Sequence, residues 1–277
     1  MNNEVGKQLR ISRRARRFLG RGRASVDRRY LWTTIGLGGW PFAGPARGDR
    51  CPRNMLTMKA FARQLFLLFA MAAPLFTLAG TLHYWQAWTF LAVYFASSMA
   101  IILYLLRKDP KLLERRLGGG PLAEKQTSQK IIKFLTTLGF IGVILVSACD
   151  HRFAWSRVPA PVALAGDALV ALGWLAIFFV FKENSFASAT IELAPDQKVI
   201  STGPYALVRH PMYAGSFVML LGSAIALGSW NGVLVIVALI SVRVWRIIDE
   251  EKFLARHLPG YVAYQAKVRY RLIPLVW

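Results

Sequence analysis

Six blocks of mostly apolar residues follow one another along the chain after residue 60. They run approximately over 61–80, 86–106, 131–149, 162–181, 212–228 and 231–248. A helix needs about 20 mostly apolar residues to cross the hydrocarbon core of a bilayer, and lipid offers backbone groups no hydrogen-bond partner. The pattern therefore predicts an all-α, polytopic integral membrane helical bundle with about six spans.

The last two blocks are short, and only the segment 228–232 (GSWNG) separates them. Glycine and asparagine in such a cluster are typical of a turn. We therefore expect these blocks to form a tight helical hairpin. Because either helix of the hairpin can be too short to cross, five spans is the alternative to six.

Composition supports a membrane protein. Of the 277 residues, 55% are hydrophobic and only 18% are charged, whereas soluble domains have roughly a quarter of their residues charged. The two cysteines, Cys51 and Cys149, are too few for a disulfide framework or a cysteine metal site. No spacing of histidines and carboxylates resembles a zinc site, and we expect no bound metal.

The N-terminal segment, residues 1–58, differs from the rest of the chain. It carries thirteen Lys and Arg residues against three acidic ones and shows little helical periodicity. It lacks the pattern of a signal peptide. We expect a basic, disordered extension without catalytic residues, and a natural start codon would stand at Met55 or Met58. A tail on anionic lipid and a nucleic-acid-binding arm are the alternatives.

The basic residues also predict an orientation. Segment 107–130 carries seven Lys and Arg residues, whereas the predicted turns at 81–85 and 228–232 carry none. Segments 182–210 and 249–277 again carry Lys and Arg residues, three and five respectively. Cytoplasmic loops are enriched in Lys and Arg, so both termini and the polar segments near the C-terminus are expected on the cytoplasmic side.

One polar segment, residues 197–215 (QKVISTGPYALVRHPMYAG), has the features of a helix start. Pro211 suits the first position of a helix, with His210 near the N-cap and Tyr213 in the first turn. Such a helix end presents N–H groups and partial positive charge to an anionic group. The alternative is a simple junction between loop and span, with Arg209 at the lipid headgroups and Tyr213 in the aromatic belt.

A second polar segment begins at Arg243, within the last apolar block. Arg246 and Glu250 are four residues apart and share a helix face. Charged residues at the end of an apolar span indicate a functional site. The alternative is an interfacial ion pair with snorkelling arginines, although this explains the three consecutive acids at 249–251 less well.

Together, the two segments resemble the isoprenylcysteine carboxyl methyltransferase family and its phospholipid N-methyltransferase relatives. The resemblance covers roughly residues 182–274. The residues that carry it are Gly203, Pro204, Tyr205, Arg209, His210, Pro211, Met212, Tyr213, Ala214, Gly215, Arg246, Glu250, Glu251, Tyr261, Tyr264, Arg269 and Pro274. Upstream, Asn184 to Phe186 and Gln197 to Ile200 look like the bacterial branch of that family.

Hydropathy predicts a four-span membrane region at 59–181. The resemblance implies that S-adenosylmethionine binds at the cytoplasmic end of the last helices, within residues 182–277. The residues implied to surround it are Gln197, Lys198, Val199, Ile200, Tyr205, His210, Pro211, Met212, Tyr213 and Glu250. Arg246 is implied to face the methyl acceptor, with Arg246 and Glu250 as the catalytic pair. On chemical grounds Glu250 suits the ammonium of the cofactor, and the helix start suits its carboxylate.

The expected activity is carboxyl O-methylation of an isoprenylcysteine-like or other lipophilic substrate, by a multi-pass protein of the bacterial inner membrane. A carboxylate acceptor needs only an orienting cation such as Arg246. Phospholipid N-methylation, the first alternative, needs a base such as Glu251 or His210 to remove a proton. An NADPH-dependent membrane reductase of isoprenoids or sterols and a non-enzymatic scaffold are two further hypotheses. We expect no nucleic-acid partner, and the acceptor stays open.

Overall fold

Helices form at the apolar blocks that the sequence shows. The computed structural model describes residues 53–119, 127–187 and 197–277, and these contain helices but no strand. The long helices are α2 (Arg53–Ala79), α3 (Trp85–Lys108), α5 (Thr127–Phe153), α6 (Ala160–Glu183) and α8 (Trp230–His257). The short ones are α4 (Pro110–Leu117), the 3₁₀ helix η3 (Gly203–Ala206), α7 (Pro211–Ala226) and α9 (Tyr261–Lys267). The all-α, polytopic fold class is confirmed.

Five of these helices, α2, α3, α5, α6 and α8, are long and apolar enough to cross a membrane. The fifth apolar block forms α7, which has only 16 residues. At 1.5 Å per residue it extends about 24 Å, less than the hydrocarbon core of about 30 Å. It is short because the loop before it ends at Pro211 and the chain turns at Gly228, whose φ is +74°. The expected hairpin of α7 and α8 is confirmed, and five is the number of full-length candidate spans.

The first helix begins earlier than the sequence indicated. We expected the basic extension to reach residue 58, but α2 starts at Arg53 and already includes Met55 and Met58. The helix extends about two turns further toward the N-terminus than the apolar block that begins at residue 61. The remainder of the expected extension lies outside the described residues.

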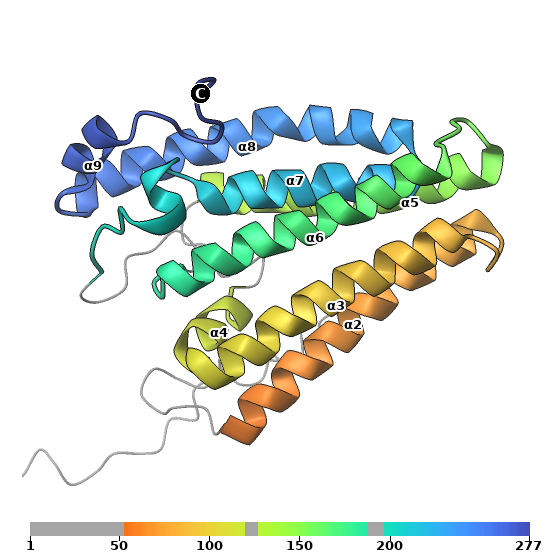
Figure 1. Cartoon of the computed structure of the whole chain (residues 1–277), viewed down its shortest axis with the longest axis horizontal. Helices are drawn as coiled ribbons and strands as arrows, with labels where there is room; N and C mark the ends of the chain where they lie inside the picture. The colour runs from red at the N-terminus through yellow and green to blue at the C-terminus, as the bar shows by residue number, and fades with distance from the viewer. Residues whose placement is uncertain (1–52, 120–126, 188–196) are drawn as a thin grey trace, which may run out of the picture. The chain divides into compact units, whose positions relative to one another are not determined.

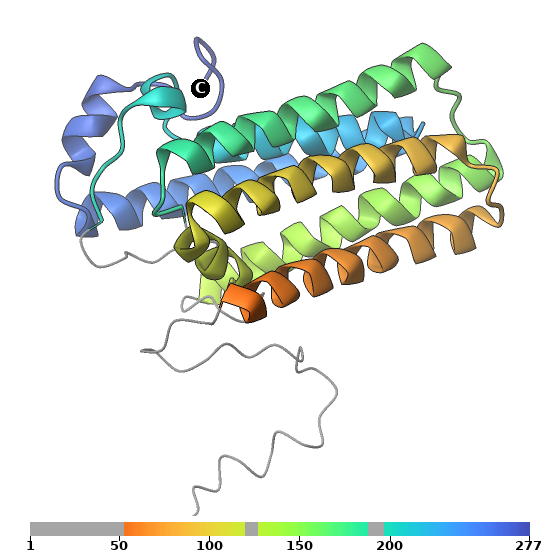
Figure 2. The same cartoon turned by 60° about the horizontal axis from the view of Figure 1, so that its bottom comes forward.

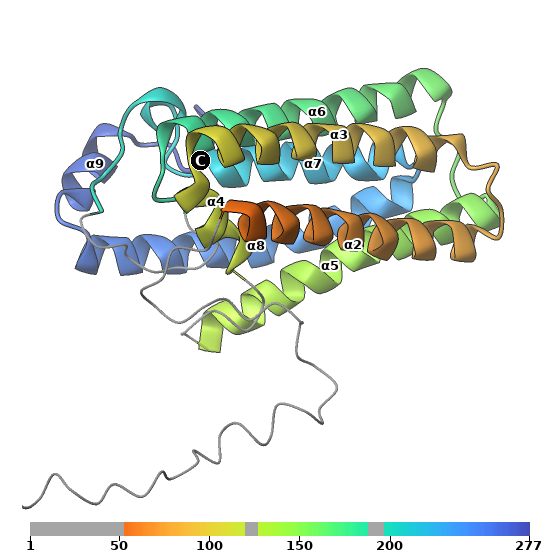
Figure 3. The same cartoon turned by 90° about the horizontal axis from the view of Figure 1, so that it is seen from below.

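The helices of the bundle pack in two layers (Figures 1 and 3). One layer contains α3, α6 and α7, and the other contains α2, α5 and α8. Contacts of α2 with α3 and of α7 with α8 join the layers. Large apolar side chains such as Phe69, Phe134 and Leu234 remain exposed on the outer faces, as expected for surfaces that face lipid.

Glycines allow α6 and α7 to approach closely. A Cβ added at Gly173 would lie 2.6 Å from the Met219 backbone nitrogen, and one at Gly222 would lie 2.7 Å from the Val170 nitrogen. Small residues at such positions let membrane helices pack backbone to backbone. This contact fixes α7 against α6 and thereby places the first turn of α7, where the motif residues lie.

The two ends of the bundle differ. Helices α4 and α9 and the η3 loop gather at one end, whereas the turns after α2, α5 and α7 lie at the other (Figures 1 and 2). At the turn end, the fully buried Asp150 accepts hydrogen bonds from the Ser156 N–H (2.7 Å) and from the Ser229 hydroxyl (2.6 Å). This carboxylate joins the end of α5 to the start of α8. The polar motifs all lie at the opposite end.

Candidate active site

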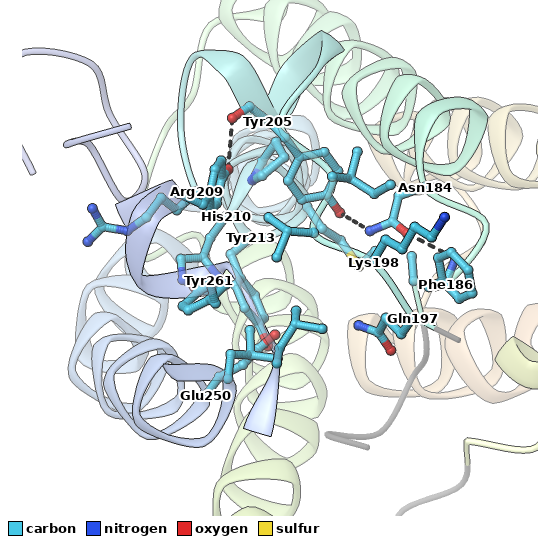
Figure 4. A pocket seen from close by; sticks show the side chains of 18 of the residues that line it. Asn184, Phe186, Gln197, Lys198, Tyr205, Arg209, His210, Tyr213, Glu250 and Tyr261 are labelled. Carbon is cyan, nitrogen blue, oxygen red and sulfur yellow. Dashed lines mark hydrogen bonds between the residues drawn. The ribbon is translucent and has the colours of Figure 1, made fainter. Parts of the chain in front are cut away.

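A cavity of about 140 Å³ lies at the end of the bundle that carries the motifs (Figure 4). Its walls come from the start of α7, the second half of α8, the η3 loop, α9 and the segment before η3. Every site residue predicted from the sequence lines this cavity: Gln197, Lys198, Val199, Ile200, Tyr205, His210, Pro211, Met212, Tyr213, Arg246 and Glu250. The fold thus brings the two motifs together, and the roles assigned to these residues remain predictions.

The start of α7 has the local structure that its sequence indicated. Pro211 is the first helical residue and His210 is the N-cap, whose side chain makes no capping hydrogen bond. The N–H groups of Arg209 and His210 donate to the carbonyls of Tyr270 and Arg271, both at 2.9 Å. The segment near the C-terminus therefore holds the loop in place, and the start of α7 faces the cavity.

Glu251 is the centre of a buried ionic cluster. It is only 5% exposed, and its two oxygens receive Arg209 Nε (2.6 Å) and Arg271 Nε (3.0 Å). His210 Nε2 lies 3.2 Å from the first oxygen. A buried carboxylate requires such partners to offset its lost hydration. Glu251 therefore anchors the loop at Arg209 and His210, and the C-terminal segment around Arg271, to α8.

Tyr213 links the two residues of the predicted catalytic pair. Its hydroxyl donates to Glu250 Oε2 (2.6 Å) and accepts from Arg246 Nε (2.8 Å). Arg246 also donates from Nη1 to Gln129 Oε1 (2.8 Å), and the Gln129 amide donates to Asp249. Helices α5, α7 and α8 thus hold Arg246 in one orientation at the cavity wall.

The aromatic side of the cavity is held by its own hydrogen bonds. The Tyr264 hydroxyl donates to the Tyr205 carbonyl (2.7 Å), and the Asn184 amide donates to the Tyr205 hydroxyl (2.9 Å). Burial raises the pKa of Tyr205 to about 12, so the phenol stays neutral at physiological pH. The Tyr261 hydroxyl is buried and finds no hydrogen-bond partner within the described residues. This unpaired group at the cavity is available to a ligand.

Sequence reasoning missed some of these residues. Asn184, Phe186, Tyr261 and Tyr264 carried the family resemblance but were given no role, and all four line the cavity. Leu254 and Leu258 were not anticipated, although they continue the four-residue spacing of Arg246 and Glu250 along one face. Nothing in the sequence pointed to Gln129, which orients Arg246. A single glutamine at the edge of an apolar block is typical of a membrane interface and does not indicate a site.

A second, larger cavity of about 460 Å³ adjoins the first within the bundle. Residues of all the long helices, of α4 and of α7 line it, and most of them are apolar. Met212, Tyr213 and Arg246 line both cavities. These side chains thus form a shared wall between a polar cavity at the end of the bundle and a largely apolar one inside it.

These features define a polytopic helical membrane protein with a polar cavity at one end of the bundle and a larger, mostly apolar cavity beside it. Residues 162–259 match the profile of the family described as phospholipid methyltransferase, which covers membrane methyltransferases of both the isoprenylcysteine and the phospholipid type. This region contains most of α6, all of α7 and α8, and the segments around Pro211 and Glu250. Its similarity to that family supports a membrane methyltransferase. Members of the family generally use S-adenosylmethionine. No curated protein matches the chain.

Proposed function

We propose that this protein transfers a methyl group from S-adenosylmethionine to the carboxylate of a lipophilic acceptor such as an isoprenylcysteine. The observation that carries the proposal is the shared wall of the two cavities. Arg246 stands in that wall, while Glu251, one of the two bases expected for an amine acceptor, already has three cationic or histidine partners. The site therefore supplies an orienting cation rather than an available base.

The polar cavity fits the groups of S-adenosylmethionine. Glu250 provides a carboxylate for its ammonium, and the uncapped start of α7 suits its carboxylate. The aromatic and apolar side chains of Tyr205, Leu254 and Leu258 suit a planar base. The buried Tyr261 hydroxyl offers one further hydrogen bond. When bound, this cofactor supplies a methyl group on a sulfonium, and transfer of that group leaves a neutral thioether.

An acceptor carboxylate reacts in its ionised form. Its oxygen forms the new bond to the methyl carbon as the carbon–sulfur bond breaks, and no proton has to be removed. Arg246 would hold that carboxylate by a charge-assisted hydrogen bond. Because the reaction is a displacement between two bound molecules, most of the acceleration is expected from holding them in line. The contacts of Arg246 with Tyr213 and Gln129 supply such positioning.

Phospholipid N-methylation is the second candidate, and the description of the matching family favours it. An amine acceptor has to lose a proton, and Glu251 or His210 were the bases expected from the sequence. Both belong to the same buried cluster with Arg209 and Arg271. If Glu251 or His210 accepted the proton of an amine, the contacts of that cluster with the loop before α7 would be disrupted. This favours the carboxylate acceptor. The family match likewise favours methyl transfer over the nicotinamide-dependent reduction considered from the sequence.

The test uses the purified protein in neutral detergent with methyl-labelled S-adenosylmethionine, a prenylcysteine analogue and mixed phospholipids. Transferred label that mild base releases is expected, because a methyl ester hydrolyses readily. Base-stable label in the lipid fraction would replace this proposal with N-methylation. If no label is transferred and the cofactor does not bind, methyl transfer at this site is wrong.

A further inference from the structure

The part of the chain after Glu251 has an uneven distribution of charge. Residues 252–277 contain five Lys and Arg residues and no Asp or Glu. Lys267 and Arg269 are exposed, and neither forms an ion pair with a carboxylate in the part of the chain that the structure describes. The preceding acids, Asp249 to Glu251, all accept hydrogen bonds from side chains elsewhere in the protein. This surface therefore presents positive charge to its surroundings.

Apolar side chains are exposed beside these charges. They belong to residues 272–277, here called the C-terminal turn, and are Ile273 (51% exposed), Leu275 (85%) and Val276 (74%). The segment folds back on itself, because the Trp277 carbonyl accepts a hydrogen bond from the Arg271 N–H (2.8 Å). The guanidinium carbon of Arg271 lies 5.1 Å from the centre of the Trp277 ring. The C-terminal turn is thus a compact apolar element with its side chains turned outward.

The fold places the C-terminal turn at the boundary between the polar end and the apolar body of the bundle. The carbonyls of Tyr270 and Arg271 accept from the N–H groups of Arg209 and His210, both at 2.9 Å. The apolar helix α7 begins at the next residue, Pro211. Figures 1 and 2 show the chain returning from α9 toward the bundle before it ends. The turn therefore lies level with the start of α7, where the headgroup region of a bilayer is expected.

A basic and apolar surface at this level complements anionic lipid. The basic loops predict that this end of the bundle faces the cytoplasm. The cytoplasmic leaflet carries anionic lipids, which attract Lys and Arg side chains near its surface. Apolar side chains beside such basic residues enter the boundary between headgroups and acyl chains. Lys267 ends α9 and Arg269 follows two residues later, so both charges precede the C-terminal turn by only a few residues.

We propose that the C-terminal turn docks on anionic phospholipids of the membrane that holds the bundle. Lys267 and Arg269 meet the lipid phosphates, and Leu275 and Val276 enter the apolar boundary. The inference goes beyond the proposed function, since these four residues line neither cavity. It requires neither the cofactor nor the methyl acceptor.

Lipid docked on the C-terminal turn also supports the start of α7. Arg271 directly precedes the turn, and its Nε donates to Glu251 (3.0 Å). Glu251 in turn holds Arg209 (2.6 Å), in the loop from which α7 begins. Restricting the motion of the turn therefore restricts this loop as well. Anionic lipid is expected to slow local opening of the segment before α7.

The first arm of the test measures the depth of the C-terminal turn in lipid nanodiscs. In a variant with Cys51 and Cys149 replaced by serine, Leu275→Cys carries a bimane label. A fixed share of the phosphatidylcholine is brominated near the headgroup end of its acyl chains, where bromine quenches a label that reaches this depth. Stronger quenching is expected in discs that also contain phosphatidylglycerol. A label that is quenched in neither kind of disc, or equally in both, would overturn the inference.

The second arm removes the charges, with Lys267→Gln and Arg269→Gln combined in the labelled protein. Each substitution is expected to lower the ratio of docked to undocked label about five-fold in discs with phosphatidylglycerol. The matched control combines Arg107→Gln and Lys108→Gln, which removes the same charge from exposed residues at the end of α3. The control should keep the quenching of the unsubstituted labelled protein. An equal loss in both double variants would show that Lys267 and Arg269 form no docking surface.

The third arm follows hydrogen exchange of the Arg209 and His210 amides in the same discs. Phosphatidylglycerol is expected to slow this exchange, and the double variant of Lys267 and Arg269 should lose the effect. Unchanged exchange of the α6 amides shows that the variant is folded. If the two amides exchange equally in both lipids, the turn does not support α7. None of the three arms uses S-adenosylmethionine, so their failure leaves the proposed function standing.

Discussion

At the scale of single residues, Glu250 and Arg246 both form a hydrogen bond with the Tyr213 hydroxyl, but they do not line the same cavities. Glu250 lines only the polar cavity, whereas Arg246 also lines the apolar one. Glu250→Gln is therefore expected to weaken binding of S-adenosylmethionine about ten-fold or more, because a charged partner is lost. Arg246→Ala should keep cofactor binding and abolish turnover. Calorimetry and a methyl-transfer assay separate the two effects, and normal behaviour of both variants would show that the site is misplaced.

Glu251, the next residue, is expected to act on stability instead. Replacing it by glutamine leaves the buried Arg209 without its charge partner, and breaking a buried ion pair costs about 3–5 kcal/mol. Glu251→Gln should therefore lower the thermal midpoint of the protein in detergent and loosen the C-terminal segment. A fully stable Glu251→Gln variant that binds the cofactor but has no activity would instead identify Glu251 as the base of an N-methyltransferase.

At the scale of elements, the close packing of α6 against α7 positions the site. Gly173→Ala introduces a methyl group 2.6 Å from the Met219 nitrogen, a contact that the backbone can relieve only by moving. We expect a loss of about 1–3 kcal/mol in unfolding free energy and weaker cofactor binding, since α7 carries Tyr213. Thermal denaturation in detergent measures the first effect and calorimetry the second.

Gly142→Ala is the matched control for that variant. Its Cβ would meet Val235 Cγ1 at an ordinary distance of 3.4 Å, and it lies in α5, away from the α6–α7 contact. It is expected to retain wild-type stability. Comparable losses for both glycine variants would mean that helix packing in general, rather than the α6–α7 contact, supports the site.

At the scale of the whole molecule, the distribution of basic loops predicts the orientation in the membrane. Leu82 is exposed at the turn end of the bundle, and Gly118 is exposed at the end with the site. In a variant with Cys51 and Cys149 replaced by serine, Leu82→Cys should react with an impermeant maleimide in intact cells. Gly118→Cys should react only after the membrane is opened, because positively charged loops stay in the cytoplasm. The reverse pattern would place the site outside.

Much of the fold was predictable from the chain because its cause is local. In lipid only helices and closed barrels satisfy their backbone hydrogen bonds, and apolar runs of about 20 residues have the length of helices rather than of barrel strands. Most of the spans therefore followed directly from hydropathy. The start of α7 was equally local, since Pro211 cannot occupy a helix interior without loss of a hydrogen bond. Boundaries were less certain, as the early start of α2 at Arg53 shows.

The chain alone therefore determined the membrane class, the helical bundle and the two polar segments that meet at the site. Only the tertiary structure decided how those segments are held. Gln129 reaches Arg246 across 117 positions of sequence, and Glu251 gathers partners from a loop and from the C-terminal segment. The cavity that joins Arg63 to Arg243 arises in the same way. Such contacts depend on the rotation and depth of each helix, which close packing sets and which hydropathy does not encode.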